Sequence, residues 1–176
     1  MLFRSFPSTS AKPLADVSDR EYYTATQNRG GGSLYFSAPV ISRVTGKWGI
    51  PIAYRLRPNS HGLLALFAVV EFDVLDEMFS DLLENSRQSV DIVRDDRLVL
   101  SRTPYNEALV GNPLEFNPGT AGFEVIVVDS SAFGSGNERL RAVYARRLER
   151  LPIYVLVADS HARMNQEAVR SLLPGA

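Results

Sequence analysis

The sequence predicts an α+β protein in which antiparallel sheets are accompanied by a small number of helices. Two observations lead to this fold class. Short runs that alternate apolar and polar residues follow one another with turn residues between them, as in consecutive hairpins. Apolar residues at helical spacing occur in few places, chiefly 74–83 and 162–173. Strands that run consecutively favour α+β over an alternating β-α-β arrangement.

Size and composition limit the classes of function. The chain has 176 residues, enough for one ordinary domain or two small ones. With 19 Lys and Arg against 20 Asp and Glu, the formal net charge is −1, so we expect no nucleic-acid partner. The sequence has no cysteine, which excludes disulfides, zinc-thiolate sites and cysteine nucleophiles. No apolar run reaches the roughly 18–20 residues that span a bilayer.

The first half of the sequence predicts an antiparallel sheet with few helices to cover it. Residues 34–40 alternate as a half-buried strand does, and 48–57 alternate in the same way. Pro51 cannot donate to a ladder, so we expect it at a sheet edge or a bulge. Residues 58–62 predict a turn, after which the apolar run 63–72 is expected to return as a buried strand.

An amphipathic helix is predicted over 74–83, with Asp73 as its N-cap. Burial of its apolar stripe against the preceding sheet is favoured over a partner surface, since most such stripes are core. The stripe contains Leu75, Met78, Phe79, Leu82 and Leu83.

The second half repeats the plan of hairpins followed by a helix. A hairpin is expected from 90–93 and 98–100, with a tight turn at Asp95 and Asp96. Three more strands and a final helix are expected at 123–128, 140–148, 153–158 and 162–173. The polar stretch 84–88 then separates two modules, 1–83 and 84–176. Residues 2–6 resemble a strand already under way, so we expect the first module to lack its beginning.

No enzyme motif was found. Gly30–Gly32 lacks the lysine and the helix of a phosphate loop, and 134–136 lacks the five-residue nucleophile elbow. The two histidines, His61 and His161, are expected on the surface. Asp95 and Asp96 lack the further oxygen ligands of a calcium loop. We therefore expect no catalytic residue, no metal site and no cofactor.

What remains is a set of aromatic and basic residues in the first half. Tyr22, Tyr23 and Trp48 could form apolar walls, and Arg43 and Arg55 could bind a carboxylate through paired hydrogen bonds. Such a set is typical of a small-molecule pocket.

Structural roles explain the same residues. Trp48 shares a strand face with Ile50 and is equally consistent with plain core. Arg55 is more often part of a solvated strand face than a ligand clamp. Asp19 could cap a helix, and Arg20 could pair with a neighbouring acid.

At this point the motifs resemble a known family. Asp19–Tyr23 resembles the Asp-Arg-x-Tyr-Phe segment of the periplasmic double-Cache (PDC, PAS-like) sensor domains of bacterial diguanylate cyclases and sensor histidine kinases. Pro39–Trp48, with its Ser-x-x-Thr-Gly-Lys-Trp sequence, resembles their strand–turn–strand segment and is the most specific part. In the second half the hairpin at 93–105, Gly111 and the closing strands near 138–140 and 151–155 are similar to the family as well.

The resemblance implies two PAS-like (PDC/Cache) antiparallel sheet modules in tandem, on the periplasmic side of a bacterial inner membrane. Module 1–83 would be membrane-distal and bind a small amino or organic acid. Module 84–176 would be membrane-proximal and lead through its final helix toward the membrane and an output domain outside this chain. A homodimeric parent receptor is implied, with membrane contact only through segments absent here. The implied pocket residues are Tyr22, Tyr23, Arg43, Lys47, Trp48 and Arg55.

Two departures from the family pattern concern the fold. Arg97 stands at the hairpin turn where the family usually has glycine. The long N-terminal helix and first strand of the distal module have no counterpart in the sequence. Two rivals to the sensor interpretation are a non-binding structural or dimerisation module of a receptor and an enzyme of unrecognised type. The shortage of His and Cys argues against the enzyme.

Overall fold

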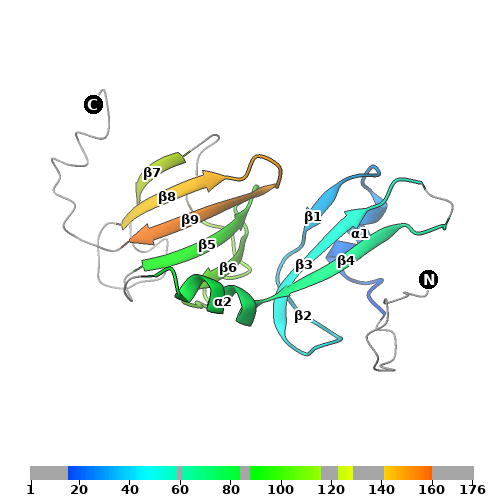
Figure 1. The fold of residues 1–176 in the computed structure, drawn as a ribbon, viewed down its shortest axis with the longest axis horizontal. Coiled ribbons are helices and arrows are strands. Elements are labelled where there is room, and N and C mark those ends of the chain that lie inside the picture. The colour runs from blue at the N-terminus through cyan, green and yellow to red at the C-terminus, as the bar shows by residue number, and fades with distance from the viewer. Residues whose placement is uncertain (1–15, 59–60, 84–87, 116–122, 129–140, 160–176) are drawn as a thin grey trace. The chain divides into compact units, whose positions relative to one another are not determined.

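The computed structural model describes residues 16–58, 61–83, 88–115, 123–128 and 141–159. The chain divides into two compact units, Met1–Leu75 and Asp76–Ala176, and each contains its own antiparallel sheet (Figure 1). The predicted α+β class is therefore confirmed. The strand expected at 2–6 and the helix expected at 162–173 lie outside the described residues.

The sheet of the first unit is built around one long strand. Strand β3 pairs with β1 and β2 along one side and with β4 along the other, all antiparallel. The elements are α1 (Glu21–Gln27), β1 (Leu34–Phe36), β2 (Val40–Ile41), β3 (Trp48–Arg55) and β4 (Ala65–Glu71). The single strand expected over 34–40 is thus two short strands, with an interruption between Phe36 and Val40.

Pro51 lies in this central strand, so the expected edge position is wrong. Its carbonyl accepts a hydrogen bond from the N–H of Ser37 at 2.9 Å. In an antiparallel strand the nitrogen and carbonyl of one residue face the same side, so the proline nitrogen also faces the interruption between β1 and β2. No ladder bond is needed at that point. The irregularity that proline requires lies in the partner strands.

Strand β4 is not the buried strand that its apolar run predicted. Leu66 is 52% exposed and Val69 is 38% exposed. Among the described residues β4 pairs with β3 alone. A continuous apolar run is typical of a strand covered on both faces, but it does not itself provide the covering layers.

Helix α2 (Phe72–Ser80) begins and ends earlier than predicted. Asp73 lies in its first turn and does not cap it. Leu75 is buried, and Phe79 and Leu83 are half-buried, but Met78 and Leu82 are exposed, so the stripe is buried only in part. The physical reason is the connection, because β4 ends at the residue before the helix begins. No loop is present with which the helix could turn back over its own sheet.

The second unit contains a five-stranded sheet in the order β6-β5-β9-β8-β7 (Figure 1). The five strands predicted for this half are confirmed. Their bounds are β5 (Gln88–Arg94), β6 (Val99–Thr103), β7 (Phe123–Val128), β8 (Arg141–Arg147) and β9 (Ile153–Asp159).

One face of this sheet carries the principal core. Leu156 of β9 pairs with Ala145 of β8 and with Asp91 of β5, so these three side chains share a face. The segment after β6 adds Leu114 to the same cluster. The buried apolar members are Val93, Val99, Leu114, Val143, Ala145, Tyr154, Leu156 and Ala158.

The β5–β6 turn accepts Arg97 in the place of the family's glycine. Arg97 has φ 74°, in the left-handed region, and its N–H bonds to the carbonyl of Arg94 at 2.8 Å. Asp96 stabilises the turn by accepting hydrogen bonds from the Arg94 guanidinium at 2.7 and 2.9 Å. These bonds hold a backbone conformation that side chains with a Cβ adopt at a cost.

We expect Arg97→Gly to raise the free energy of unfolding by about 0.5–1 kcal/mol, since relief of left-handed strain exceeds the entropy that glycine adds to the unfolded chain. Arg97→Ala is the control, because it removes the same charge and keeps the Cβ. Urea unfolding of the three proteins measures the effect. A glycine variant no more stable than the alanine variant would show that this turn is unstrained.

Candidate functional site

The N-terminal end of α1 is held to the β2–β3 turn by an arginine. The Arg43 guanidinium donates two hydrogen bonds to the Asp19 carboxylate, each 2.7 Å long. It donates a third to the carbonyl of Asp16 at 2.6 Å. The hydrogen bond from Arg43 holds the pKa of Asp19 below its ordinary value, and the same bond raises the pKa of Arg43. The hydrogen bonds of the Arg43 guanidinium are therefore made to groups of the protein itself.

The Ser-x-x-Thr-Gly-Lys-Trp segment forms the turn itself. Ser42 Oγ accepts hydrogen bonds from the N–H groups of Val44 and Thr45, both 3.2 Å long. Gly46 has φ 72°, where glycine is favoured. The N–H of Ser42 bonds to the carbonyl of Lys47 at 2.8 Å and closes the hairpin. The most specific part of the family resemblance is therefore explained by turn geometry.

Glu21, which the sequence suggested only as a possible partner of Arg20, attaches α1 to the interruption between β1 and β2. Its carboxylate accepts hydrogen bonds from the Tyr35 hydroxyl, from Ser37 Oγ at 2.8 Å and from the Ala38 N–H at 2.9 Å. Because Ser37 is fully buried, this carboxylate satisfies a hydroxyl that has no access to water.

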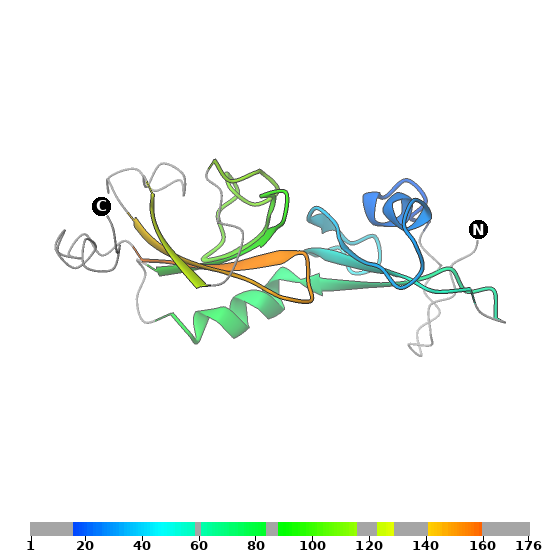
Figure 2. The ribbon, with the colours of Figure 1, turned by 90° about the horizontal axis from the view of Figure 1, so that it is seen from above.

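The two tyrosines of α1 pack on the sheet around Phe67 of β4. The Tyr22 ring lies 5.5 Å from the Phe67 ring, and the Tyr23 ring stacks at 6.4 Å. Burial raises the pKa of Tyr22. Phe67 pairs with Ala53, so the covered side, here named the α1 face, is fixed by the register (Figure 2). The α1 face consists of Tyr35, Pro51, Ala53, Arg55, Phe67 and Val69.

Basic side chains lie at the end of this face where β1 begins. Arg55 is the last residue of β3, and its side chain is half-buried on the α1 face. The guanidinium carbon of Arg29, from the loop after α1, lies 4.6 Å from the centre of the Tyr35 ring. Aromatic rings provide apolar walls, and the guanidinium groups beside them provide hydrogen-bond donors for a carboxylate. No periodic pattern in the sequence points to Arg29, because it lies in a loop.

Trp48 and Lys47 lie elsewhere. Trp48 alternates with Gly49 along β3, so it lies on the face opposite the α1 face, where it stacks on Phe72 at 6.3 Å. It is 46% exposed, so it is not plain core. Lys47 pairs with Asp73 at 2.9 Å and Glu71 at 3.3 Å, and the pairing with Asp73 contributes most to its raised pKa.

The six residues expected to bind ligand are therefore divided. Tyr22, Tyr23 and Arg55 share the α1 face, while Arg43 is engaged by Asp19 at the turn. Their binding role stays a prediction.

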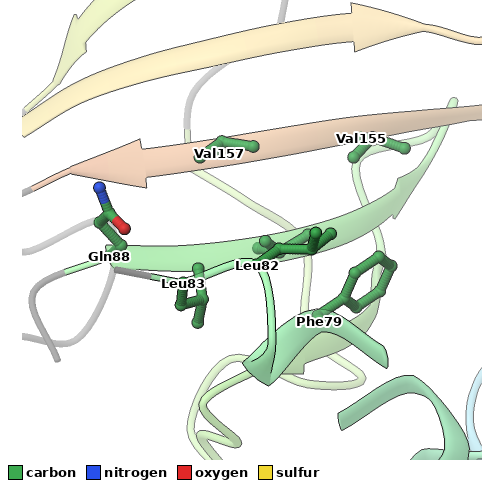
Figure 3. Close-up of a pocket in the computed structure, with 7 residues that line it drawn as sticks. Phe79, Leu82, Leu83, Gln88, Val155 and Val157 are labelled. Atoms are coloured by element: carbon green, nitrogen blue, oxygen red, sulfur yellow. The ribbon is translucent and has the colours of Figure 1, made fainter. Parts of the chain in front are cut away.

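The second unit contains an apolar groove of about 280 Å³ between the end of α2 and the strands β5 and β9 (Figure 3). Its one polar lining group is the amide of Gln88. An amino or organic acid needs fixed charged partners, which such a lining does not supply. The lining consists of Phe79, Leu82, Leu83, Gln88, Val90, Val155 and Val157.

Within the described residues, no group of three or more His, Asp or Glu side chains is placed to hold a metal ion. The same part of the chain has no helix long and apolar enough to cross a membrane.

Comparison with known proteins gives structural matches alone. No protein-family model matches the sequence. No curated protein matches it either. The extracellular domain of a protein described as a histidine kinase, rpHK1S-Z16, matches with a TM-score of 0.64 and 20% identity over 95% of this chain. The chain has the fold of a receptor sensor domain.

Two chemoreceptor domains share this sensor-domain fold. The ligand-binding domain of Pseudomonas fluorescens CtaA, in complex with L-leucine, has a TM-score of 0.58 and 18% identity over 86% of this chain. The ligand-binding domain of Pseudomonas aeruginosa PAO1 PctB, in complex with L-Gln, has a TM-score of 0.57 and 15% identity over 96% of this chain. The chain spans 68% of the kinase domain, 64% of the CtaA domain and 67% of the PctB domain. The double-module α+β fold expected from the resemblance is thereby confirmed.

We expect Arg43→Gln to raise the pKa of Asp19 toward that of an ordinary carboxyl. Arg43→Lys should raise this pKa less, since lysine keeps the charge but not the paired hydrogen-bond geometry. Because the folded pKa lies below the unfolded one, the stabilisation is present above the unfolded pKa and is lost as pH falls through the folded pKa. NMR titration of the side-chain carboxyl measures this. An unchanged pKa in Arg43→Gln would contradict the pairing.

Proposed function

We propose that this chain is the extracytoplasmic sensing region of a bacterial membrane receptor and that it has no catalytic activity of its own. The observation that carries the proposal is the fold, which matches such domains over 86–96% of the chain. The first unit would be membrane-distal and the second membrane-proximal. Output would come from a kinase, cyclase or chemotaxis domain outside the chain.

The proposed ligand is a small amino or organic acid. CtaA and PctB were solved with L-leucine and L-Gln, and a third domain of this fold, PctC, with GABA. All three ligands carry a carboxylate. The α1 face offers a matching chemistry, because Arg55 can donate paired hydrogen bonds to a carboxylate and Tyr23 can contact an apolar side chain.

Binding would act on the receptor by differential affinity. A ligand that prefers one arrangement of the receptor shifts the population toward it by no more than that difference in affinity. Ordering of α1 on the sheet is the local event that the contacts of Glu21, Tyr22 and Tyr23 support.

A thermal-shift screen of amino acids and short carboxylates tests the proposal, followed by calorimetric titration of any hit. A ligand at 100 times its Kd is expected to stabilise the protein by about 2.7 kcal/mol. Arg55→Gln is expected to weaken binding at least tenfold with the fold intact. Arg146→Gln, an exposed arginine in β8, is the matched control and should bind normally.

If neither this chain nor a longer version that includes its flanking segments is stabilised by any such compound, the small-molecule proposal fails. Equal loss of binding in Arg55→Gln and Arg146→Gln would place the site away from the α1 face.

A second candidate is a non-binding module that spaces or dimerises a receptor. Internal pairing favours it, because Arg43 is engaged by Asp19, and Lys47 by Glu71 and Asp73. Trp48→Ala together with the ligand screen separates the two candidates. If no compound in the screen stabilises the protein and the Trp48→Ala variant folds normally, the spacing role is supported.

A further inference from the structure

Charge is distributed unevenly between the two units of the chain. Residues 1–75 contain eight Lys and Arg against five Asp and Glu, a formal charge of +3. Residues 76–176 contain eleven against fifteen, a formal charge of −4. The total of −1 therefore conceals a surplus of positive charge in the unit that contains the α1 face. Such a surplus attracts small anions.

The acids of the first unit are engaged by other groups of that unit. Arg43 pairs with one carboxylate, and Lys47 pairs with two. The remaining two accept hydrogen bonds from backbone N–H and hydroxyl groups. The five acids are Asp16, Asp19, Glu21, Glu71 and Asp73.

Two arginines at one end of the α1 face, Arg29 and Arg55, have no carboxylate partner within the described part of the chain. Arg55 is half-buried at the end of β3, and Arg29 lies on the Tyr35 ring at 4.6 Å. Tyr35 pairs with Ala53, so Tyr35 and Arg55 are diagonal neighbours on one face, with Cα atoms about 7–8 Å apart. The side chains of both arginines therefore adjoin the same aromatic residue.

The loop that carries Arg29 is fixed to the end of β3. The N–H of Gly32 donates to the carbonyl of Arg55 at 2.7 Å. A Cβ at Gly31 would lie 2.9 Å from the Cα of Arg57, so this close approach requires glycine. The glycine run that forms no phosphate loop thus holds the Arg29 loop against the strand that carries Arg55.

We propose that this end of the α1 face binds a small dicarboxylic acid, with one carboxylate on Arg55 and the other on Arg29. The inference rests on the sensor function proposed above and narrows its ligand to compounds with two acid groups. A single carboxylate would neutralise one guanidinium and leave the other, whereas a diacid neutralises both. Each carboxylate can pair with its own guanidinium through two parallel hydrogen bonds.

The same charges disfavour an amino group on the ligand. An ammonium beside Arg29 and Arg55 is repelled unless a carboxylate accompanies it. Glu21, the one acid of α1, already accepts three hydrogen bonds from the protein itself. The ligands solved with CtaA, PctB and PctC are L-leucine, L-Gln and GABA, and each carries one carboxylate and one amino group. We therefore expect this chain to prefer a ligand of a different charge.

Calorimetric titration with a matched pair of ligands tests the inference. Succinate and butyrate have the same chain length, but succinate carries two carboxylates and butyrate carries one. The wild-type chain should bind succinate at least about fivefold more tightly than butyrate, and more tightly than aspartate, which adds an ammonium group. Equal affinities for succinate and butyrate, or a higher affinity for aspartate, would overturn the inference and leave the proposed function standing. If no acid and no amino acid binds, the proposed function itself fails.

Substitution tests the assignment of the second carboxylate to Arg29. Arg29→Gln should lower the affinity for succinate to that for butyrate. Arg29→Lys should retain part of the difference, since lysine keeps the charge without the planar fork. Arg29 is an exposed loop residue, so both variants should fold, which circular dichroism checks.

Arg20→Gln is the matched control, because it removes the same charge from the first unit at the other end of α1. There Arg20 donates to the carbonyl of Ile41 at 3.4 Å. This variant should keep the wild-type preference for succinate. Equal losses in Arg29→Gln and Arg20→Gln would show that net charge alone attracts the ligand, and would overturn the assigned site.

Discussion

Replacing Asp91 by alanine is expected to lower the free energy of unfolding by about 3–5 kcal/mol, because it leaves a buried guanidinium without its carboxylate. Arg102 Nη1 donates to Asp91 at 2.8 and 3.1 Å across the β5–β6 pair. The side chain of Asp91 is 0% exposed and that of Arg102 is 6% exposed. Water therefore cannot replace the lost partner.

Equilibrium urea unfolding measures this effect, and an exposed pair of the same chemistry in the same unit provides the control. Arg147 pairs with Asp95 at 3.0 Å with both side chains more than a third exposed, so Asp95→Ala should cost less than about 1 kcal/mol. The double variant Asp91→Leu with Arg102→Met should recover most of the loss, since it leaves no buried charge. Equal effects of Asp91→Ala and Asp95→Ala would contradict the burial argument.

Leu156→Ala is expected to cost about 2–5 kcal/mol, the range for a leucine that leaves a cavity in a core. Leu156 is fully buried in β9, between Asp91 of β5 and Ala145 of β8. The vacated space is bounded by paired strands on both sides, so the surrounding structure can collapse little.

The adjacent residue provides a matched control for this substitution. Val157 points to the opposite face of the same strand and is partly exposed, so Val157→Ala should cost less than about 1.5 kcal/mol. Thermal and urea unfolding of both variants compare the two faces. A larger loss for Val157→Ala than for Leu156→Ala would mean that the principal core lies on the groove side of the sheet.

The strands of the second unit were predictable because each is specified locally. The continuous apolar run 153–158 after Pro152 identifies β9, and the turn residues Asp95 and Asp96 separate β5 from β6. The ion pair between Asp91 and Arg102 had no comparable signal. It requires the register of two strands to be known before a carboxylate and a guanidinium can be placed opposite each other.

For the candidate site, the residues could be recognised but not their grouping. Alternation along β3 correctly separated Trp48 and Ile50 from Ala53 and Arg55. It could not show which of the two faces α1 covers. That choice depends on Glu21 and on the packing of Tyr22 against Phe67, contacts between segments far apart in the sequence.

The sequence by itself determined the α+β class, most strand positions and the turn chemistry of Ser42–Lys47, because these depend on neighbours within a few residues. Only the tertiary structure decided that β4 leaves Leu66 and Val69 exposed, that Trp48 and Tyr22 lie on opposite faces, and that Arg43 is engaged by Asp19. Which residues are buried or paired depends on which helices and strands pack against each other. Hydrophobic patterning specifies a face to be covered, whereas the long-range contacts specify what covers it.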